Sequence, residues 1–375
     1  MPYLIIIRYL NIVFIKFADE VIYINAGKAY IRGVAPYFIN FEHPPLAKYV
    51  IGFFSMLGIS TYLPMIMIIS AIVLIYYIVH RYLNYKHAYL YLAIVATDTL
   101  VINASFFNLL NCVTLLLVVL YLYVALKCIT LDKHGKIYVL GFLAGLALAS
   151  KWSSIYIMVP VLLTLFIFNK EVIRRIHILL AMALVAYITT FIMDFVSGGP
   201  YLFVKHNIDM INYMLWRHSA TLPLMVNGFL TLIGKVSFWF HKYHEYITLT
   251  IVNSSYVNYT IFLPKVCRLL VEFECWLGSF AWPLMFYYSL KLVYDSIKNK
   301  DRTWAIISSA ILGSALLPIL HGNMAWYYLF YAVLAPIAMI KYAPRRLLLI
   351  VIALNVTQIV LLKLRILSIM YSFSF

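Results

Sequence analysis

The chain has 375 residues, of which 65% are hydrophobic and only 11% charged, and its mean hydropathy is +0.93. Soluble domains carry about a quarter charged residues, so this composition excludes a soluble globular domain, a disordered chain and a disulfide-rich secreted scaffold. The net charge of +16 is assigned to the basic loops of a membrane protein rather than to nucleic-acid binding. We therefore predict an all-α polytopic membrane protein embedded in a lipid bilayer.

Long apolar stretches predict the transmembrane helices. Stretches of about 17 to 25 residues are long enough to cross a bilayer. We identify about eleven candidates, at about 3–17, 62–79, 88–104, 109–126, 137–150, 152–168, 178–196, 276–293, 304–320, 325–340 and 347–366. The first is short and carries Arg8 and Lys16, but no small-residue cleavage site follows it, which favours a span over a signal peptide.

Basic residues indicate which way these spans face. Alternate connections are short and basic, as cytoplasmic loops are; they carry Arg81, Lys86, Lys127, Lys133, Lys136, Lys170, Arg174, Arg175, Lys298, Lys300, Arg302, Lys341, Arg345 and Arg346. The N-terminus is then inside and the C-terminus outside. The outer face receives two long loops, residues 18–61 and 197–275, and residues 1–375 form a single transmembrane domain.

Ionisable residues near a bilayer are costly, so their places in the sequence are informative. Those that we single out all fall on or near the outer face: Asp19, Glu20, Glu42, His43, Lys48, Asp98, Lys151, Asp194, Lys205, His206, Asp209, Arg217, His218 and His321. This segregation predicts a polar site at the outer membrane boundary of a cell-membrane protein.

The first outer loop carries the most specific pattern. Asp19-Glu20 follows a span directly, and His43-Pro44-Pro45-Leu46-Ala47-Lys48 comes about twenty residues later. The two prolines end any preceding helix, and residues 21–31 and 46–59 fit helices on the membrane surface. A lone Asp at such a boundary is more often a helix cap or a solvated carboxylate; the whole constellation favours a functional site.

At these residues the sequence resembles the dolichyl-phosphate-mannose protein O-mannosyltransferases, a family within the GT-C superfamily of membrane glycosyltransferases. The family carries an Asp-Glu pair after its first span and then His-Pro-Pro-Leu-Gly-Lys; Ala47 stands here in place of the glycine. The small-residue stretch 141–150, ending in Lys151-Trp152, is similar to a further family element. The resemblance covers roughly residues 1–200.

The sequence departs from the family at several points. Tyr62-Leu63-Pro64 replaces a usual arginine, and Leu109-Leu110-Asn111 replaces Leu-Leu-Asp. His218 lies near the place of a family histidine but lacks its tryptophan-rich continuation. No large soluble domain interrupts the second outer loop, which favours an archaeal or other prokaryotic member.

The resemblance implies a GT-C fold and transfer of mannose from a polyprenyl phosphate to a Ser or Thr hydroxyl of a protein, with inversion. It makes Asp19 the general base, with Glu20 orienting the loop or the acceptor. The expected substrate-binding residues are His43, Pro44, Pro45, Lys48, Lys151, Trp152, Arg217, His218 and His321. Lys151 is the favoured cation for the leaving phosphate; its alternative role is a lysine reaching to the membrane interface.

Other features and functions are weighed beside this one. His241 and His244 fall short of a zinc signature, so no metal cofactor is indicated, although dependence on a divalent metal is left open. A disulfide between Cys267 and Cys275 is also open. The nearest alternative function is transfer of another lipid-linked sugar to a lipid or glycan. An inactive partner subunit is the third possibility, favoured by Asn111 and by the missing arginine. A transporter is disfavoured because the sequence shows no charge relay at mid-membrane.

Overall fold

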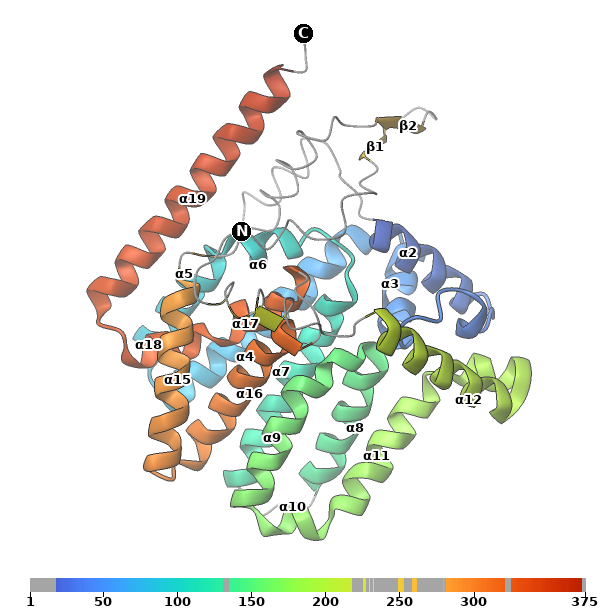
Figure 1. The fold of residues 1–375 in the computed structure, drawn as a ribbon, viewed down its shortest axis with the longest axis horizontal. Coiled ribbons are helices and arrows are strands. Elements are labelled where there is room, and N and C mark those ends of the chain that lie inside the picture. Colours follow the sequence, from blue (N-terminus) through green and yellow to red (C-terminus); the bar gives the residue numbers. More distant parts are fainter. Residues whose placement is uncertain are drawn as a thin grey trace.

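The computed structural model describes residues 18–130, 135–217, 249–252, 258–261, 281–320 and 325–372, together with the isolated residues 225–226, 229, 232 and 279. Within these residues the chain is helical, apart from an antiparallel hairpin of β1 (Leu249–Val252) and β2 (Asn258–Ile261). Figure 1 shows a bundle with helices α2, α3 and α12 grouped at one side. The predicted first span, 3–17, lies outside the described residues.

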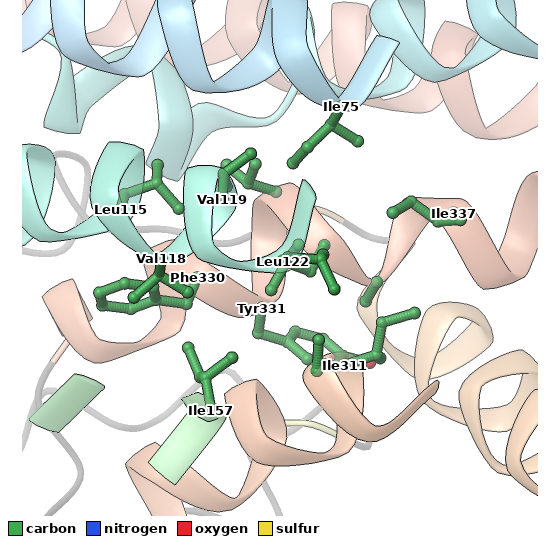
Figure 2. Close-up of a cluster of buried hydrophobic side chains, with 14 of the residues drawn as sticks. Ile75, Leu115, Val118, Val119, Leu122, Ile157, Ile311, Phe330, Tyr331 and Ile337 are labelled. Carbon is green, nitrogen blue, oxygen red and sulfur yellow. The ribbon is translucent and has the colours of Figure 1, made fainter. Parts of the chain in front are cut away.

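Helix α7 (Leu110–Thr130) is the centre of the bundle. It packs against α4 (Leu63–Tyr82), α8 (Gly135–Ser150), α9 (Ile155–Phe168) and α16 (Arg302–Leu320). Its apolar side chains are buried on several faces, as expected of a helix inside a multi-helix core. Figure 2 shows this core, which includes Ile75, Leu115, Val118, Val119, Leu122, Ile157, Ile311, Phe330, Tyr331 and Ile337.

The C-terminal half completes the bundle beside α5 (Tyr85–Ala96) and α6 (Thr99–Ala104). Its helices are α15 (Trp282–Lys298), α17 (Tyr328–Leu334), α18 (Pro336–Tyr342) and α19 (Arg345–Ser372). Short 3₁₀ turns connect several elements: η1 (Pro36–Phe38), η2 (Ser60–Tyr62), η3 (Trp152–Ser154) and η4 (Ala325–Tyr327). Helix α17 is buried along its whole length, so η4, which precedes it, is tied to the core.

Glycine permits a close helix contact in the bundle. Helix α11 (Ile176–Thr189) lies along α8, and α10 (Lys170–Arg174) connects α9 to α11 at their far end (Figure 1). A Cβ atom on Gly145 would lie 2.1 Å from the carbonyl oxygen of Ala183. Small residues four apart on α8, Gly141 and Gly145, therefore let the two backbones approach as in membrane helix pairs.

Helices α2 (Ala18–Ile31) and α3 (Leu46–Met56) pack against each other beside this bundle. They cross at Gly27 and Gly52, where a Cβ on either glycine would overlap the other backbone. Pro45 is the residue that precedes α3, as the two prolines predicted. The first outer loop is thus a folded unit whose connection, residues 32–45, faces α12.

Among the described residues, three helices are long and apolar enough to cross a membrane, at Ser60–Tyr82, Leu110–Ile129 and Arg302–Leu320. A bent pair, Ile176–Thr189 with Ile192–Leu215, makes a fourth if it is one span. The three helices support a membrane protein and correspond to the predicted spans 62–79, 109–126 and 304–320, and the bent pair overlaps the predicted span 178–196. The count of eleven and the inside-to-outside orientation stay predictions.

Several predicted spans are divided in the structure; 325–340, for example, comprises η4, α17 and α18. The stretch 88–104 is broken into α5 and α6 because Asp98 accepts hydrogen bonds from the N–H groups of Leu100 and Val101 and so begins a new helix. Trp282 of α15 donates to the same carboxylate at 3.0 Å. The apolar pattern alone does not reveal this break.

A second correction concerns the predicted span 178–196. Its first helix, α11, ends at Thr189. Helix α12 (Ile192–Arg217) then turns by 105°, and it is itself broken at Gly198 and Gly199, the latter with φ +65°. Asp194 lies in the first turn of α12 and is fully buried among protein groups. The second outer loop therefore begins with a helix laid across the end of α11.

Candidate active site

Asp19 and Glu20 lie in the first turn of α2, where carboxylates complement the positive end of a helix. Asp19 is partly exposed, whereas Glu20 is buried. Glu20 accepts hydrogen bonds from the side-chain amide of Asn108, at 2.7 Å, and from its backbone N–H, at 3.3 Å. Glu20 therefore fixes the start of α2 to the start of α7, which leaves Asp19 as the more accessible carboxylate.

Lys151, at the end of α8, is buried with only 3% of its surface exposed. Its Nζ donates a 2.6 Å hydrogen bond to Oδ1 of Asn111 and lies 4.7 Å from the ring centroid of Tyr327. The Asn111 amide donates to the carbonyl of Trp326 at 2.7 Å. Lys151 is thus held inward by α7 and η4, and is not a lysine extended along the membrane interface.

The charges of Asp19 and Lys151 influence each other. Burial lowers the pKa of Lys151 to about 7, and the negative charge of Asp19 acts in the opposite direction. The predicted base and the predicted phosphate cation, which lie far apart in the sequence, are therefore within electrostatic reach of each other. A carboxylate and a buried ammonium of this kind suit a reaction in which a proton is accepted and an anion leaves.

Lys48 is bonded to backbone and side-chain groups of the first outer loop. It is fully buried, and its ammonium donates to the carbonyls of Asn40 and His43 and to the hydroxyl of Tyr30. Burial lowers the pKa of Lys48 to about 7. Because the three hydrogens are used inside the loop, the contacts indicate that Lys48 closes the loop, and its expected role as a substrate-binding cation stays a prediction.

His43, Pro44 and Pro45 are buried at the start of α3. The ring of His43 packs edge-on against Tyr23, with 6.3 Å between the ring centroids. Tyr23 lies one helical turn after Asp19 on α2, so both residues are on the same helix face. The His-Pro-Pro turn is therefore placed beside the predicted base, as the sequence pattern requires.

Trp152 connects the end of α8 to neighbouring helices through hydrogen bonds. Its indole N–H donates to the hydroxyl of Tyr187 at 3.0 Å, and that hydroxyl donates to Oδ1 of Asn207 at 2.7 Å. This chain of hydrogen bonds joins the end of α8 to α11 and α12. Trp152 thus orients the backbone next to Lys151, which is a supporting role within the predicted set.

Three predicted residues are not placed. His218 and His321 lie outside the described residues, and so do His241, His244, Cys267 and Cys275; Arg217 ends α12, but its side chain is not described. Cys112 and Cys128 are buried free thiols, as their places in apolar spans indicate. Among the described residues, no three His, Cys, Asp or Glu side chains converge as a metal site would require.

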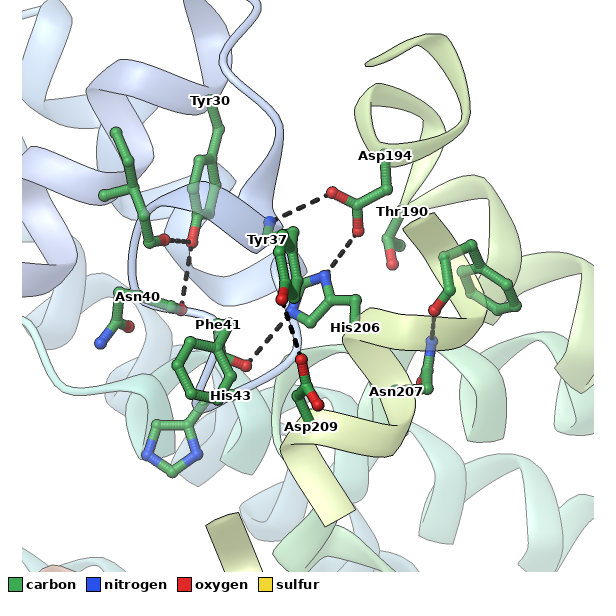
Figure 3. Close-up of polar contacts among 12 residues, drawn as sticks. Tyr30, Tyr37, Asn40, Phe41, His43, Thr190, Asp194, His206, Asn207 and Asp209 are labelled. Carbon is green, nitrogen blue, oxygen red and sulfur yellow. Dashed lines mark hydrogen bonds and ion pairs between the residues drawn. The ribbon is translucent and has the colours of Figure 1, made fainter. Parts of the chain in front are cut away.

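Sequence reasoning missed several residues of the site. Asn108 binds Glu20, and the η4 residues Trp326 and Tyr327 surround Lys151. None of them belongs to a motif, and only the departure at Asn111 marked this end of α7. A second polar cluster joins Asp194 and His206 to the first outer loop (Figure 3); the sequence placed both on the outer face but gave them no function.

Comparisons with known proteins bear on the family and on the fold. Residues 42–194 match the family model described as dolichyl-phosphate-mannose-protein mannosyltransferase, which confirms the resemblance seen in the motifs. The matched range includes His43, Asn111 and Lys151 but begins after Asp19 and Glu20. No curated protein matches the chain.

Two solved structures share the fold. ArnT from Cupriavidus metallidurans bound to undecaprenyl phosphate is 14% identical with a TM-score of 0.57, and the same protein in the apo state is 12% identical with a TM-score of 0.53. Each match covers 92% of this chain and 60% of the ArnT chain. The likeness confirms the GT-C fold, and the chain spans about three fifths of the length of these ArnT structures.

Proposed function

We propose that this chain is a membrane glycosyltransferase that moves mannose from a polyprenyl phosphate to the hydroxyl of a protein Ser or Thr, on the outer face of the cell membrane. The observation that carries the proposal is a partly exposed carboxylate, Asp19, within electrostatic reach of a buried ammonium, Lys151, which is held by Asn111 of α7 and Tyr327 of η4. The family-model match supports the choice of mannose and of a protein acceptor.

Asp19 is suited to the role of general base. The acceptor oxygen attacks the anomeric carbon of mannose as the bond from that carbon to the phosphate oxygen breaks, and the hydroxyl proton passes to Asp19. The electrons of the broken bond stay on the phosphate, so the products are the glycosylated acceptor and polyprenyl phosphate. An electron-poor anomeric centre in the transition state is also stabilised by the carboxylate.

Lys151 is suited to the leaving group. Breaking the anomeric bond adds negative charge to the phosphate, and a fixed ammonium in a buried site stabilises that charge strongly. Asn111 and Tyr327 hold the ammonium in place without supplying a counter-charge. A phosphate leaving group needs no strong general acid, and we assign none.

A second acceptor class is favoured by one observation. The structural likeness is to ArnT, whose structure holds undecaprenyl phosphate, while this chain departs from the mannosyltransferase family at Tyr62-Leu63-Pro64. A lipid or glycan acceptor is therefore the alternative, and an inactive partner subunit is the third reading. The lipid-phosphate donor is common to the first two.

The test is transfer from synthetic mannosyl-phosphoryl-polyprenol to a Ser/Thr-rich peptide by the purified chain, compared with Asp19→Asn. Loss of a general base lowers the rate by about 100-fold or more, and binding of polyprenyl phosphate should persist in this variant. Wild-type binding without transfer to the peptide would move the proposal to lipid and glycan acceptors. Absence of lipid binding by an intact wild-type chain would favour the inactive subunit.

A further inference from the structure

Helix α12 grips the first outer loop through a buried acid–base pair (Figure 3). Asp194 and His206 have 0% of their surface exposed, although they lie on opposite sides of the break at Gly198 and Gly199. The Asp194 carboxylate lies 2.5 Å from Nδ1 of His206 and accepts a 3.1 Å hydrogen bond from the backbone N–H of Tyr37. A buried pair of this kind is costly unless fully bonded, so its contacts define one geometry.

The other ring nitrogen of His206 holds the loop at a second point. Nε2 lies 3.2 Å from the carbonyl oxygen of Phe41, and since a carbonyl only accepts, we assign a hydrogen to Nε2. The contact between Nδ1 and Asp194 then shares one further proton. A third contact, from the Tyr37 hydroxyl to Asp209 at 2.9 Å, joins the same loop to the next turns of α12.

The N-terminal helices hold the same loop from its other side. The hydroxyl of Tyr30 donates to the carbonyl of Ile39, and Lys48 donates to the carbonyls of Asn40 and His43. Asn40 has a φ of +56°, in the left-handed region that non-glycine residues rarely adopt. Such a conformation persists where the surroundings over-determine it, and it is frequent at functional loops.

The contacts between α12 and the loop position Glu42 and His43, which follow Phe41 directly. His43 packs on Tyr23, one helical turn from Asp19. We infer that Asp194 and His206 are positioning residues that hold Glu42 and His43 beside Asp19, an inference that rests on the proposed function. They act through the loop and not by touching the reacting atoms.

The experiment replaces each member of the pair in the full chain, as Asp194→Ala and His206→Ala. Misplacing reacting groups by about 1 Å costs up to about 100-fold in rate, so kcat for mannose transfer should fall by about 10- to 100-fold. Binding of polyprenyl phosphate, assigned to Lys151 on another helix, should stay within about threefold of wild type. Amide hydrogen exchange in residues 33–45 should become faster in both variants.

Two further variants separate positioning from other effects. Val204→Ala, at a half-exposed residue of the same helix, should change neither exchange nor kcat. Asp194→Asn keeps the geometry without the charge, because its amide donates to Nδ1 of a neutral His206 and its oxygen accepts from Tyr37. This variant should retain slow exchange and at least about a third of the wild-type kcat.

Two results overturn the inference. The first is unchanged amide exchange and unchanged kcat in both alanine variants. The second is an Asp194→Asn protein whose loop stays protected from exchange but whose kcat is as low as that of Asp194→Ala. That result would show that catalysis needs the charge of Asp194 and not its hold on the loop. Melting temperatures identify any variant that has lost its fold. If wild type transfers no sugar to any acceptor while the alanine variants still show faster exchange, the proposed function fails and the grip of α12 on the loop stands.

Discussion

The ammonium of Lys151 donates a 2.6 Å hydrogen bond to the amide oxygen of Asn111, at the point where the related family carries an aspartate. A neutral amide satisfies one hydrogen of Lys151 without cancelling its charge. The carboxylate of Asp19 acts on the same ammonium but is proposed to accept a proton from the acceptor. This arrangement leaves positive charge at the end of α8 for an anionic ligand such as a phosphate.

Asn111→Asp should weaken donor binding. The new carboxylate would pair with Lys151 in a buried setting, where unit charges 4 Å apart interact by about 4 kcal/mol at an effective dielectric constant of 20. The phosphate must then compete for the ammonium, and its affinity should fall by at least about tenfold. Titration with mannosyl-phosphoryl-polyprenol measures this, with Asn84→Asp at the exposed cap of α5 as the matched control. Unchanged affinity in Asn111→Asp would remove Lys151 from the phosphate site.

Donor binding should also depend on pH through Lys151. With a pKa near 7 in the free protein, the ammonium loses its proton as the pH rises above 7. Donor affinity should therefore fall between pH 7 and 9, by up to about tenfold per pH unit if binding requires the proton. The donor phosphodiester keeps one charge throughout this range, so the dependence reports the protein. Lys151→Met should bind weakly at every pH and show no such slope.

Stability should change in the opposite direction. The pKa of Lys151 is about 7 in the folded chain against an ordinary value of 10.5, and that of Lys48 is lowered in the same way. Between these values the unfolded chain binds more protons, so the free energy of unfolding rises with pH, by up to about 1.4 kcal/mol per unit for each lysine. Thermal unfolding without donor at pH 7 and 9 tests this. A melting temperature that falls would contradict the burial of these ammonium groups.

Glu20 should matter through Asn108 and not through proton transfer. Glu20→Gln keeps an oxygen that accepts from both N–H groups of Asn108, so kcat should fall less than about tenfold. Glu20→Ala leaves these buried donors unsatisfied and should destabilise the chain by about 1–3 kcal/mol. Comparing kcat and unfolding for the two variants checks this. Equal, large losses of kcat in both would make Glu20 a second catalytic carboxylate.

The sequence predicts the elements whose signal is local. The spans 62–79, 109–126 and 304–320 correspond closely to α4, α7 and α16 because continuous apolar runs define them. The place of Pro45 before α3 and the glycines of α8 are local signals too. Residues Asp19, His43 and Lys151 were identified by motif, and the fold brings them to one end of the bundle.

What the sequence does not reveal depends on partners distant along the chain. The break at Asp98 is stabilised by Trp282, 184 residues away, and the Phe41 carbonyl binds His206, 165 residues away. No local sequence pattern distinguishes Asp98 and His206, which are buried and bonded, from solvated polar residues at a membrane boundary. The contacts of Lys48 were missed for the same reason: its charge suggests a ligand, and only the folded loop shows the carbonyls to which it donates.

The contact between α8 and α11 should be intolerant of even a methyl group. Gly145→Ala would place its Cβ 2.1 Å from the carbonyl oxygen of Ala183, so the helices must separate, at a cost of about 1–3 kcal/mol. Gly135→Ala at the start of α8 is the control, since nothing lies within 4 Å of its Cβ. Unfolding in detergent compares them. If Gly145→Ala is as stable as Gly135→Ala, the two helices are not in close contact.

Substitution of Lys48 should mainly lower stability, whereas substitution of Lys151 should mainly weaken lipid binding. Both are buried lysines whose pKa is lowered to about 7, but Lys48 bonds two backbone carbonyls, whereas Lys151 bonds a side-chain amide. Lys48→Met leaves those carbonyls unsatisfied and should lower the free energy of unfolding by about 2–4 kcal/mol, with faster amide exchange in residues 33–45.

Lys151→Met removes a charge whose neighbours are an amide and an aromatic ring, so the cost in stability should be smaller, about 1 kcal/mol. Its donor affinity should nevertheless fall at least about tenfold, whereas folded Lys48→Met should bind polyprenyl phosphate within about threefold of wild type. Lipid titration and thermal unfolding of the two variants side by side give all four values. Weak lipid binding by well-folded Lys48→Met would return Lys48 to the phosphate site, because loop closure alone does not account for it.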